Sequence, residues 1–154
     1  MKPLLIIVIS IFSFLIANTY ADVAVIVNKS NPILDISYSE LVQILKAKNQ
    51  YWQRNDIITL IFKPPSSKET RILIDNIYKT DYENFEKYWL LKVYKGKVKR
   101  APKIVNSVGT VNILVSEISG AIAFVAPHEV STHSNIKVLR VEGKLPHEEG
   151  YPLK

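Results

Sequence analysis

The chain has 154 residues, is 47% apolar, and carries 20 lysines and arginines against 14 aspartates and glutamates, for a formal net charge of +6. This length and composition are those of one globular domain with enough apolar residues to build a core. The absence of cysteine excludes disulfides, thiolate metal sites, cysteine nucleophiles and the acylated cysteine of a lipoprotein.

The N-terminal segment has the pattern of a secretory signal peptide. A mostly apolar stretch, residues 4–16, follows Lys2 and leads into small residues that end at Ala21. It is too short to cross about 30 Å of hydrocarbon comfortably. We therefore expect residues 1–21 to be a signal peptide cleaved after Ala21, residues 22–154 to be the mature domain, and the protein to be periplasmic. A retained membrane anchor is the alternative interpretation.

The first half of the mature chain predicts two strands with a helix between them. Residues 23–28 are β-branched and apolar, as in a buried strand. Ser37 and Glu40 have the spacing of a capping box, which predicts a helix to about Ala47. Residues 57–63 predict a second buried strand, and two prolines must end it because proline cannot donate to a strand ladder.

Two further helices are expected after these prolines. Ser66 with Glu69 predicts the start of the first helix, and Thr80 with Glu83 predicts the start of the second. Their helical periodicity places an apolar stripe of each helix on the core. The expected core positions are Ile72, Leu73, Ile74, Ile77 and Tyr78 in the first helix and Tyr82, Phe85, Tyr88, Trp89 and Leu90 in the second.

The last third begins with a basic loop and ends with strands. Residues 94–103 are basic and broken by glycine and proline, which indicates a loop. Ser107 or Asn106 is expected to cap a short helix that Gly120 terminates. The last two strands are expected at residues 121–125 and 136–141.

The order of these elements, β-α-β-α-α-α-β-β, predicts the α/β fold class. Helices between strands favour a three-layer α/β/α arrangement around a mixed, mostly parallel sheet, with right-handed crossovers early in the chain. Ligands of such sheets bind beyond the carboxyl ends of strands, where helix N-termini meet. We therefore expect the functional site in the loops after Asn28, after Lys63 and around Ser107.

The junction after Lys63 has the residues needed to bind an oxyanion. The first N–H groups of a helix lack intrahelical acceptors and carry the positive end of its dipole. Ser66 and Ser67 stand at such a start, and Lys63 and Arg71 can add positive charge, the arginine as a bidentate fork. The alternative is that Ser66 only caps its own helix while both basic side chains lie in solvent.

A second, weaker cradle is expected where the later helix begins. Ser107, Gly109 and Thr110 repeat the combination of a capping serine and a helix start, with a glycine that allows close backbone approach.

Catalytic and metal chemistry are not indicated by the sequence. His128 and His133, with Glu129 between them, are spaced as in a loop and not as two ligands on one helical face. Nucleophile-elbow, P-loop and dinucleotide motifs are absent, so a hydrolase ranks below the other interpretations. We expect no catalytic residue, no metal and no cofactor.

Several segments, taken in chain order, form a recognisable set: VAVIVN (23–28), KAKNQYW (46–52), YWLLKVYKGK (88–97) with Pro102, SGAIAFV (119–125) and GKLPHEEGYPL (143–153). Together they resemble phosphate ABC transporter substrate-binding proteins, in their short, single-domain branch. The similarity covers nearly all of residues 23–153. This resemblance implies one lobe of a type II periplasmic-binding-protein fold that holds phosphate or a related oxyanion at strand-to-helix junctions and is not catalytic.

The resemblance also identifies residues of the anion loop. The family carries an arginine four residues before a Ser-Gly-Thr, and here Lys63 stands four residues before Ser67. Lys63, Ser66 and Ser67 are therefore the carried-over candidates. The chain departs from the family pattern at Lys68 and Glu69, which replace Gly-Thr and bring a negative charge near the anion.

Two functions follow from the sequence as hypotheses. The first is a periplasmic solute-binding domain that takes phosphate or a similar oxyanion and works with an ABC permease. The alternative is a periplasmic interaction or sensor module of the same fold without a tight ligand, which binds a membrane-associated partner, such as a membrane sensor or a transporter, through Lys95, Lys97, Lys99 and Arg100. We expect no nucleic acid partner for an exported protein. The sequence leaves the oligomeric state open.

Overall fold

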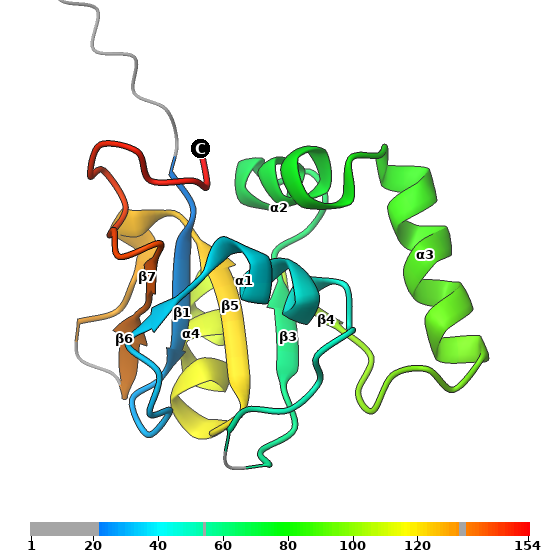
Figure 1. The fold of residues 1–154 in the computed structure, drawn as a ribbon, viewed down its shortest axis with the longest axis horizontal. Helices are drawn as coiled ribbons and strands as arrows, with labels where there is room; N and C mark the ends of the chain where they lie inside the picture. The colour runs from blue at the N-terminus through cyan, green and yellow to red at the C-terminus, as the bar shows by residue number, and fades with distance from the viewer. Residues whose placement is uncertain (1–21, 54, 133–134) are drawn as a thin grey trace, which may run out of the picture.

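The computed structural model describes residues 22–53, 55–132 and 135–154, and it contains a central sheet of five strands with helices against both faces (Figure 1). The strands lie in the order β4-β3-β5-β1-β6. Their bounds are β1 (Ala24–Asn28), β3 (Thr59–Phe62), β4 (Lys103–Ile104), β5 (Ala121–Val125) and β6 (Ile136–Val138). Two short strands, β2 (Asp35–Ile36) and β7 (Arg140–Val141), pair in parallel as a second sheet.

The central sheet is mixed and mostly parallel, as expected. β3 pairs in parallel with β4 and with β5, whereas β1 lies antiparallel between β5 and β6. The expected parallel crossover after the first strand is therefore wrong, because β1 runs against β3. Strand direction depends on partners far away in the sequence, which local periodicity does not report. In consequence Asn28 ends its strand at the sheet edge opposite to the end of β3 and does not join the expected site.

Helices cover both faces of the sheet, which confirms the three-layer α/β/α arrangement (Figure 1). α4 (Val108–Glu117) packs on one face. The opposite face carries α1 (Tyr38–Leu45), α2 (Lys68–Leu73), the π-helical turn η1 (Ile74–Tyr78) that continues α2, and part of α3 (Tyr82–Tyr94). A 3₁₀ turn, η2 (Pro127–Glu129), follows β5.

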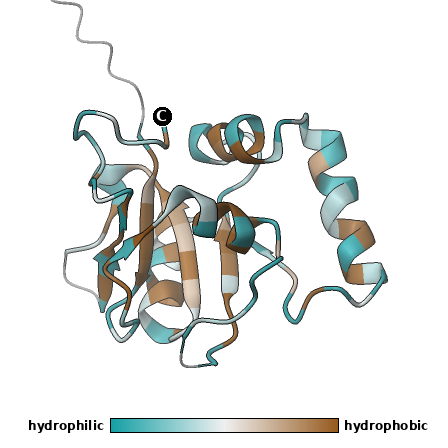
Figure 2. Ribbon diagram, viewed as in Figure 1, coloured by the Kyte–Doolittle hydropathy of each residue, from teal (hydrophilic) through white to brown (hydrophobic). Residues whose placement is uncertain are grey.

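The strands are buried on both faces because each face has its own apolar core. In β5, Ile122 and Phe124 point to the α1, α2 and α3 side, whereas the alanines and Val125 point to α4. Figure 2 shows the strands largely in brown, the colour of hydrophobic residues. The small Ala121 and Ala123 side chains allow α4 to approach this face closely.

The helix starts agree with the sequence in two cases and differ by one residue in two. The capping box of Ser37 and Glu40 and the Ser107 cap are confirmed. The cap of α2 is Ser67 instead of Ser66, because Ser67 N–H donates to the Pro64 carbonyl at 2.8 Å in a turn that moves the helix start along the chain. The cap of α3 is Asp81 instead of Thr80.

Two structural details explain the position of the α3 cap. Lys79 adopts the left-handed conformation, with φ of 52°, and ends the η1 turn. Thr80 then links the two helices, and the Asp81 carboxylate accepts a hydrogen bond from Asn84 N–H at 2.8 Å.

Burial along α3 is narrower than the sequence predicts. Phe85 and Trp89 are buried, but Tyr82 is 42% and Leu90 is 69% exposed, so their expected core positions are wrong. α3 reaches the core through one aromatic face only, where Phe85 lies 5.8 Å from Phe62 between ring centroids. Helical spacing could not show that the other apolar side chains lack a facing element.

Gly120 has a different role from the expected helix terminator. α4 ends at Glu117, and Ile118 is its C-cap. A Cβ atom at Gly120 would lie 2.1 Å from the carbonyl oxygen of Ile57, so the close approach of two backbone segments requires a glycine here.

The two ends of the described chain are joined. Val23 N–H donates to the Leu153 carbonyl at 3.0 Å, and the Tyr151 hydroxyl donates to the Val23 carbonyl at 2.6 Å. No helix within the described residues is long and apolar enough to cross a membrane. The apolar segment 4–16 and the expected cleavage site after Ala21 lie outside the described residues.

Candidate functional site

Three helical turns begin at one edge of the sheet. β3, β4 and β5 are parallel neighbours, so their carboxyl ends share this edge. Ser67 opens α2 after β3, Ser107 opens α4 after β4, and Pro127 opens η2 after β5. The first N–H groups of α2 and α4 carry partial positive charge. η2 begins with a proline, which has no N–H, so Ala126 N–H is the donor at that turn. This carboxyl edge therefore favours an anionic group.

Lys63 lies at the centre of this edge and is held by two carboxylates. Its Nζ donates to both oxygens of Glu129 at 2.8 Å and lies 3.1 Å from Oε2 of Glu69. The three side chains are 12%, 19% and 10% exposed, respectively, so they form a nearly buried charged triad. Two carboxylates against one ammonium give the triad a formal charge of −1 when all three groups are ionised.

The carboxylate of Glu129 is the anion that this edge already contains. Its Oε2 also accepts a hydrogen bond from Ala126 N–H at 2.9 Å. Burial raises the pKa of Glu129, but the hydrogen bonds from Lys63 and Ala126 and the charge of Lys63 outweigh it, so the pKa is lowered. Burial lowers the pKa of Lys63, but its bonds to Glu129 and Glu69 leave that pKa raised.

The two capping serines are engaged by their own helices. The Ser67 hydroxyl accepts from Thr70 N–H at 3.3 Å and lies 3.1 Å from the Thr70 hydroxyl oxygen. The Ser107 hydroxyl accepts from Thr110 N–H at 3.4 Å. A Cβ atom at Gly109 would meet Ser107 Oγ at an ordinary 3.6 Å, so this first turn is open on that side.

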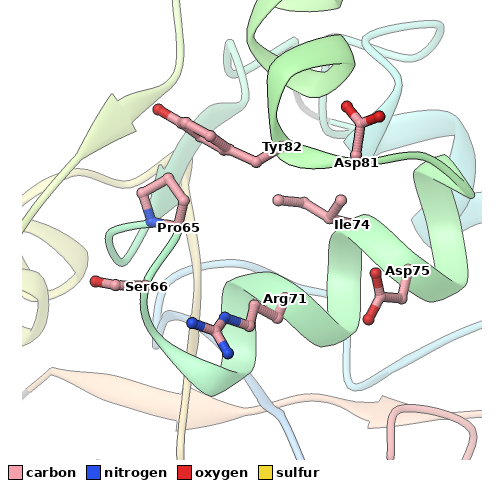
Figure 3. Close-up of a pocket in the computed structure, with 7 residues that line it drawn as sticks. All are labelled: Pro65, Ser66, Arg71, Ile74, Asp75, Asp81 and Tyr82. Atoms are coloured by element: carbon pink, nitrogen blue, oxygen red, sulfur yellow. The ribbon is translucent and has the colours of Figure 1, made fainter.

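Ser66 and Arg71 lie in a neighbouring pocket of about 500 Å³, shown in Figure 3. In this view the Ser66 hydroxyl points away from the carboxylates of Asp75 and Asp81. Asp75 and Asp81 bring two negative charges to the same pocket as the positive charge of Arg71. The pocket is lined by Pro65, Ser66, Arg71, Ile74, Asp75, Asp81 and Tyr82.

The structure therefore divides the residues chosen from the sequence. Lys63, Ser67 and the α4 start lie around the carboxyl edge, whereas Ser66 and Arg71 line the pocket beside it. Sequence reasoning missed Glu129, which was treated only as the residue between two histidines. Its position in the short turn after the buried strand β5, at the edge where ligands bind in parallel sheets, is the signal that could have found it.

The histidines give no metal site within the described residues. No group of three or more His, Asp or Glu side chains in residues 22–53, 55–132 and 135–154 could hold a metal ion. His133 lies outside the described residues, so the expectation for the His128–His133 pair is not tested.

Comparison with solved structures finds phosphate-binding proteins among the neighbours of this chain. An ABC-type phosphate transport receptor from Vibrio cholerae matches with a TM-score of 0.63 and 19% identity over 81% of this chain. PstS from Borrelia burgdorferi matches with a TM-score of 0.66 and 18% identity over 86% of this chain. A phosphate-binding protein from Stenotrophomonas maltophilia matches with a TM-score of 0.58 and 16% identity over 82% of this chain. No protein-family model and no curated protein matches the chain.

The chain carries part of the phosphate-binding-protein fold. The match spans 48%, 53% and 40% of these three solved chains, respectively, so the chain corresponds to about half of each. The phosphate-binding-protein fold agrees with the resemblance found in the sequence and with the three-layer arrangement. At these identities it fixes the architecture, and the ligand has to be argued from the chain's own residues.

Proposed function

We propose that the chain is a non-catalytic solute-binding domain that takes phosphate or a related oxyanion at the carboxyl edge. The observation that carries this proposal is the meeting of three helical starts around Lys63. Oriented N–H groups and one ammonium are the features that recognise a tetrahedral anion without any catalytic group. The phosphate-binding proteins that share the fold support the same ligand class.

The triad sets the strength of this binding. An incoming oxyanion has to replace the Glu129 carboxylate at Lys63 Nζ and at Ala126 N–H, and it meets the negative charge of Glu69. Displacing a paired, nearly buried carboxylate costs free energy, and like charges oppose the anion. We therefore expect affinity in the micromolar range or weaker.

Isothermal titration with phosphate and with sulfate tests the proposal. The wild-type protein should release or absorb heat at millimolar anion, and Lys63→Met should abolish this heat because the central cation is lost. Lys87→Met is the matched control, since it removes a lysine from an exposed lysine–glutamate pair on α3. Absence of heat from the folded wild-type protein at millimolar phosphate and sulfate would overturn the proposal.

A second variant tests the competition by Glu129. Glu129→Gln keeps the shape of the side chain but removes its charge, so Lys63 is freed for the ligand. We expect anion affinity to rise by about tenfold, which corresponds to roughly 1.4 kcal/mol. This variant also serves where Lys63→Met fails to fold. Unchanged affinity in Glu129→Gln would show that the anion does not bind at Lys63.

We also propose that the protein works in the periplasm beside an ABC permease. The supporting observations are the signal-peptide pattern of residues 1–21 and the transport role named for the Vibrio cholerae neighbour. An intact mass equal to residues 22–154, measured on protein from a periplasmic extract, would support export with cleavage after Ala21. A mass that retains residues 1–21 would favour the anchor.

A further inference from the structure

The turn that carries Glu129 is held to α4 by one buried side chain. Asn112 lies in the middle of α4 and is only 9% exposed. Its Nδ2 donates to the Glu129 carbonyl at 3.0 Å, and its Oδ1 accepts a hydrogen bond from Ser131 N–H at 3.2 Å. One amide therefore binds the backbone on both sides of Val130, where η2 ends.

The same amide also contacts the first turn of α4. Asn112 Nδ2 donates to the carbonyl of Val108, the first residue of this helix, at 3.1 Å. The side chain thus connects a helix start of the carboxyl edge with the turn that supplies Glu129. Because buried polar groups are costly to leave unpaired, these hydrogen bonds hold the amide and both backbone segments in one arrangement.

The position of the η2 backbone decides how strongly Glu129 competes for Lys63. The Glu129 carboxylate accepts hydrogen bonds from Lys63 Nζ at 2.8 Å and from Ala126 N–H at 2.9 Å. A tethered group competes with a free ligand through its effective concentration, which is highest when the tether is held in the bound geometry. The hydrogen bond from Asn112 to the Glu129 backbone supplies this restraint from outside the triad.

We propose that Asn112 is a positioning residue of the anion site, and that it weakens phosphate binding by holding Glu129 on Lys63. The inference rests on the proposed function, because it concerns an anion that replaces Glu129 at Lys63. Asn112 acts through the η2 backbone and not by contact with the anion. Its removal should therefore loosen Glu129 while Lys63 stays available to the ligand.

A second buried asparagine on the same helix provides a matched control. Asn28 is 3% exposed, and its Nδ2 donates to the carbonyls of Val115 and Ser116 at 3.0 and 2.7 Å, near the C-terminal end of α4. Asn28 lies at the edge of the sheet opposite to the end of β3. It therefore makes the same kind of contact with α4 as Asn112, but at the other end of the helix.

Isothermal titration with inorganic phosphate tests this inference. Asn112→Leu nearly keeps the size of the side chain and removes its hydrogen bonds, so phosphate should bind about threefold more tightly than to the wild-type protein. In the Glu129→Gln background the same substitution should leave phosphate affinity unchanged, because the competing charge is already absent. Asn28→Leu should leave phosphate affinity unchanged in both backgrounds.

Urea denaturation separates this effect from a loss of stability. Asn112→Leu and Asn28→Leu should both lower the urea midpoint, because each removes buried hydrogen bonds. Asn112→Ala takes the place of Asn112→Leu where the leucine variant fails to fold.

The possible results distinguish the inference from the proposed function. Phosphate affinity that is unchanged in Asn112→Leu would overturn the inference, as would a gain that persists in the Glu129→Gln background. An equal gain in Asn28→Leu would also overturn it, because general loosening of α4 would then explain both. Absence of phosphate binding in the wild-type and Glu129→Gln proteins alike would overturn the proposed function, and the inference with it.

Discussion

The carboxyl edge and the exposed side of α3 use charge in opposite ways. We call this side, which carries Leu90, Leu91, Val93 and Tyr94, the α3 face. At the edge, Lys63 is surrounded by Glu69 and Glu129 within 3.1 Å, and all three side chains are at most 19% exposed. Next to the α3 face, Lys95 and Glu86 lie in solvent, and Leu90 and Leu91 on it are exposed. The first region satisfies its charges inside the fold, whereas the second presents them outward.

The buried charges of the carboxyl edge contribute to folding, whereas the exposed charges near α3 are available to a partner. A nearly buried ion triad contributes when it is intact and costs several kcal/mol when one member is removed. Exposed charges and exposed apolar side chains contribute little to folding, but they set association rate and specificity. Substitutions in the two regions should therefore change different measurements.

The largest effect is expected from the side chain that packs beneath both regions. Phe62 precedes Lys63, and its ring lies 5.8 Å from Phe85 of α3 and 5.7 Å from Phe124 of β5. We expect Phe62→Ala to lower the free energy of unfolding by about 3–5 kcal/mol, because it leaves a cavity in the core. Urea denaturation measures this loss. Phe62→Leu is the control, and a loss for Phe62→Ala as small as for Phe62→Leu would contradict the expected packing.

The next effect contrasts two lysines that each pair with glutamate. Lys63→Met leaves two nearly buried carboxylates without a counter-charge and should cost about 3 kcal/mol. Lys87→Met removes an exposed pair, with side chains 61% and 77% exposed, and should cost at most about 0.5 kcal/mol. The same denaturation experiment compares them. Equal losses would show that the triad is not buried in solution.

The pH dependence of this difference has a defined sign. The lowered pKa of Glu129 gives stability that is complete above its ordinary value of 4.5 and is lost as pH falls through the folded pKa. The raised pKa of Lys63 gives stability that is complete below 10.5 and is lost as pH rises through the folded pKa. The wild-type advantage over Lys63→Met should therefore be greatest between these limits. An advantage that grows toward acid would contradict the pairing.

The sequence predicted most elements because burial and capping are local signals. The strand at Ala121–Val125 is buried throughout, and the Ser37–Glu40 capping box forms as expected. The antiparallel direction of β1 was missed because it depends on hydrogen bonds to β5 and β6, which join distant parts of the chain. The two-residue strands β2 and β4 are too short to show a periodicity.

The candidate site was harder to predict for the same reason. Lys63 lies at the carboxyl edge where the sequence placed the candidate site, but its partner Glu129 is 66 residues away. Motif reasoning treats each loop separately, so it could not find the carboxylate that pairs with Lys63, and the role of Lys63 toward an incoming anion stays a prediction. Ser67 caps α2 whereas Ser66 lines the neighbouring pocket, because Ser67 N–H donates to the Pro64 carbonyl. The spacing of residues in the sequence does not predict this hydrogen bond.

The smallest effect on folding is expected on the α3 face. Leu90 is 69% exposed, so Leu90→Gln should change the free energy of unfolding by no more than about 0.5 kcal/mol in dilute protein. Leu41, which is fully buried, is the matched control, and Leu41→Ala should cost about 2–5 kcal/mol. Urea denaturation of both variants in dilute protein measures these changes. A Leu90→Gln variant that loses stability there would mean that this side chain belongs to the folded core.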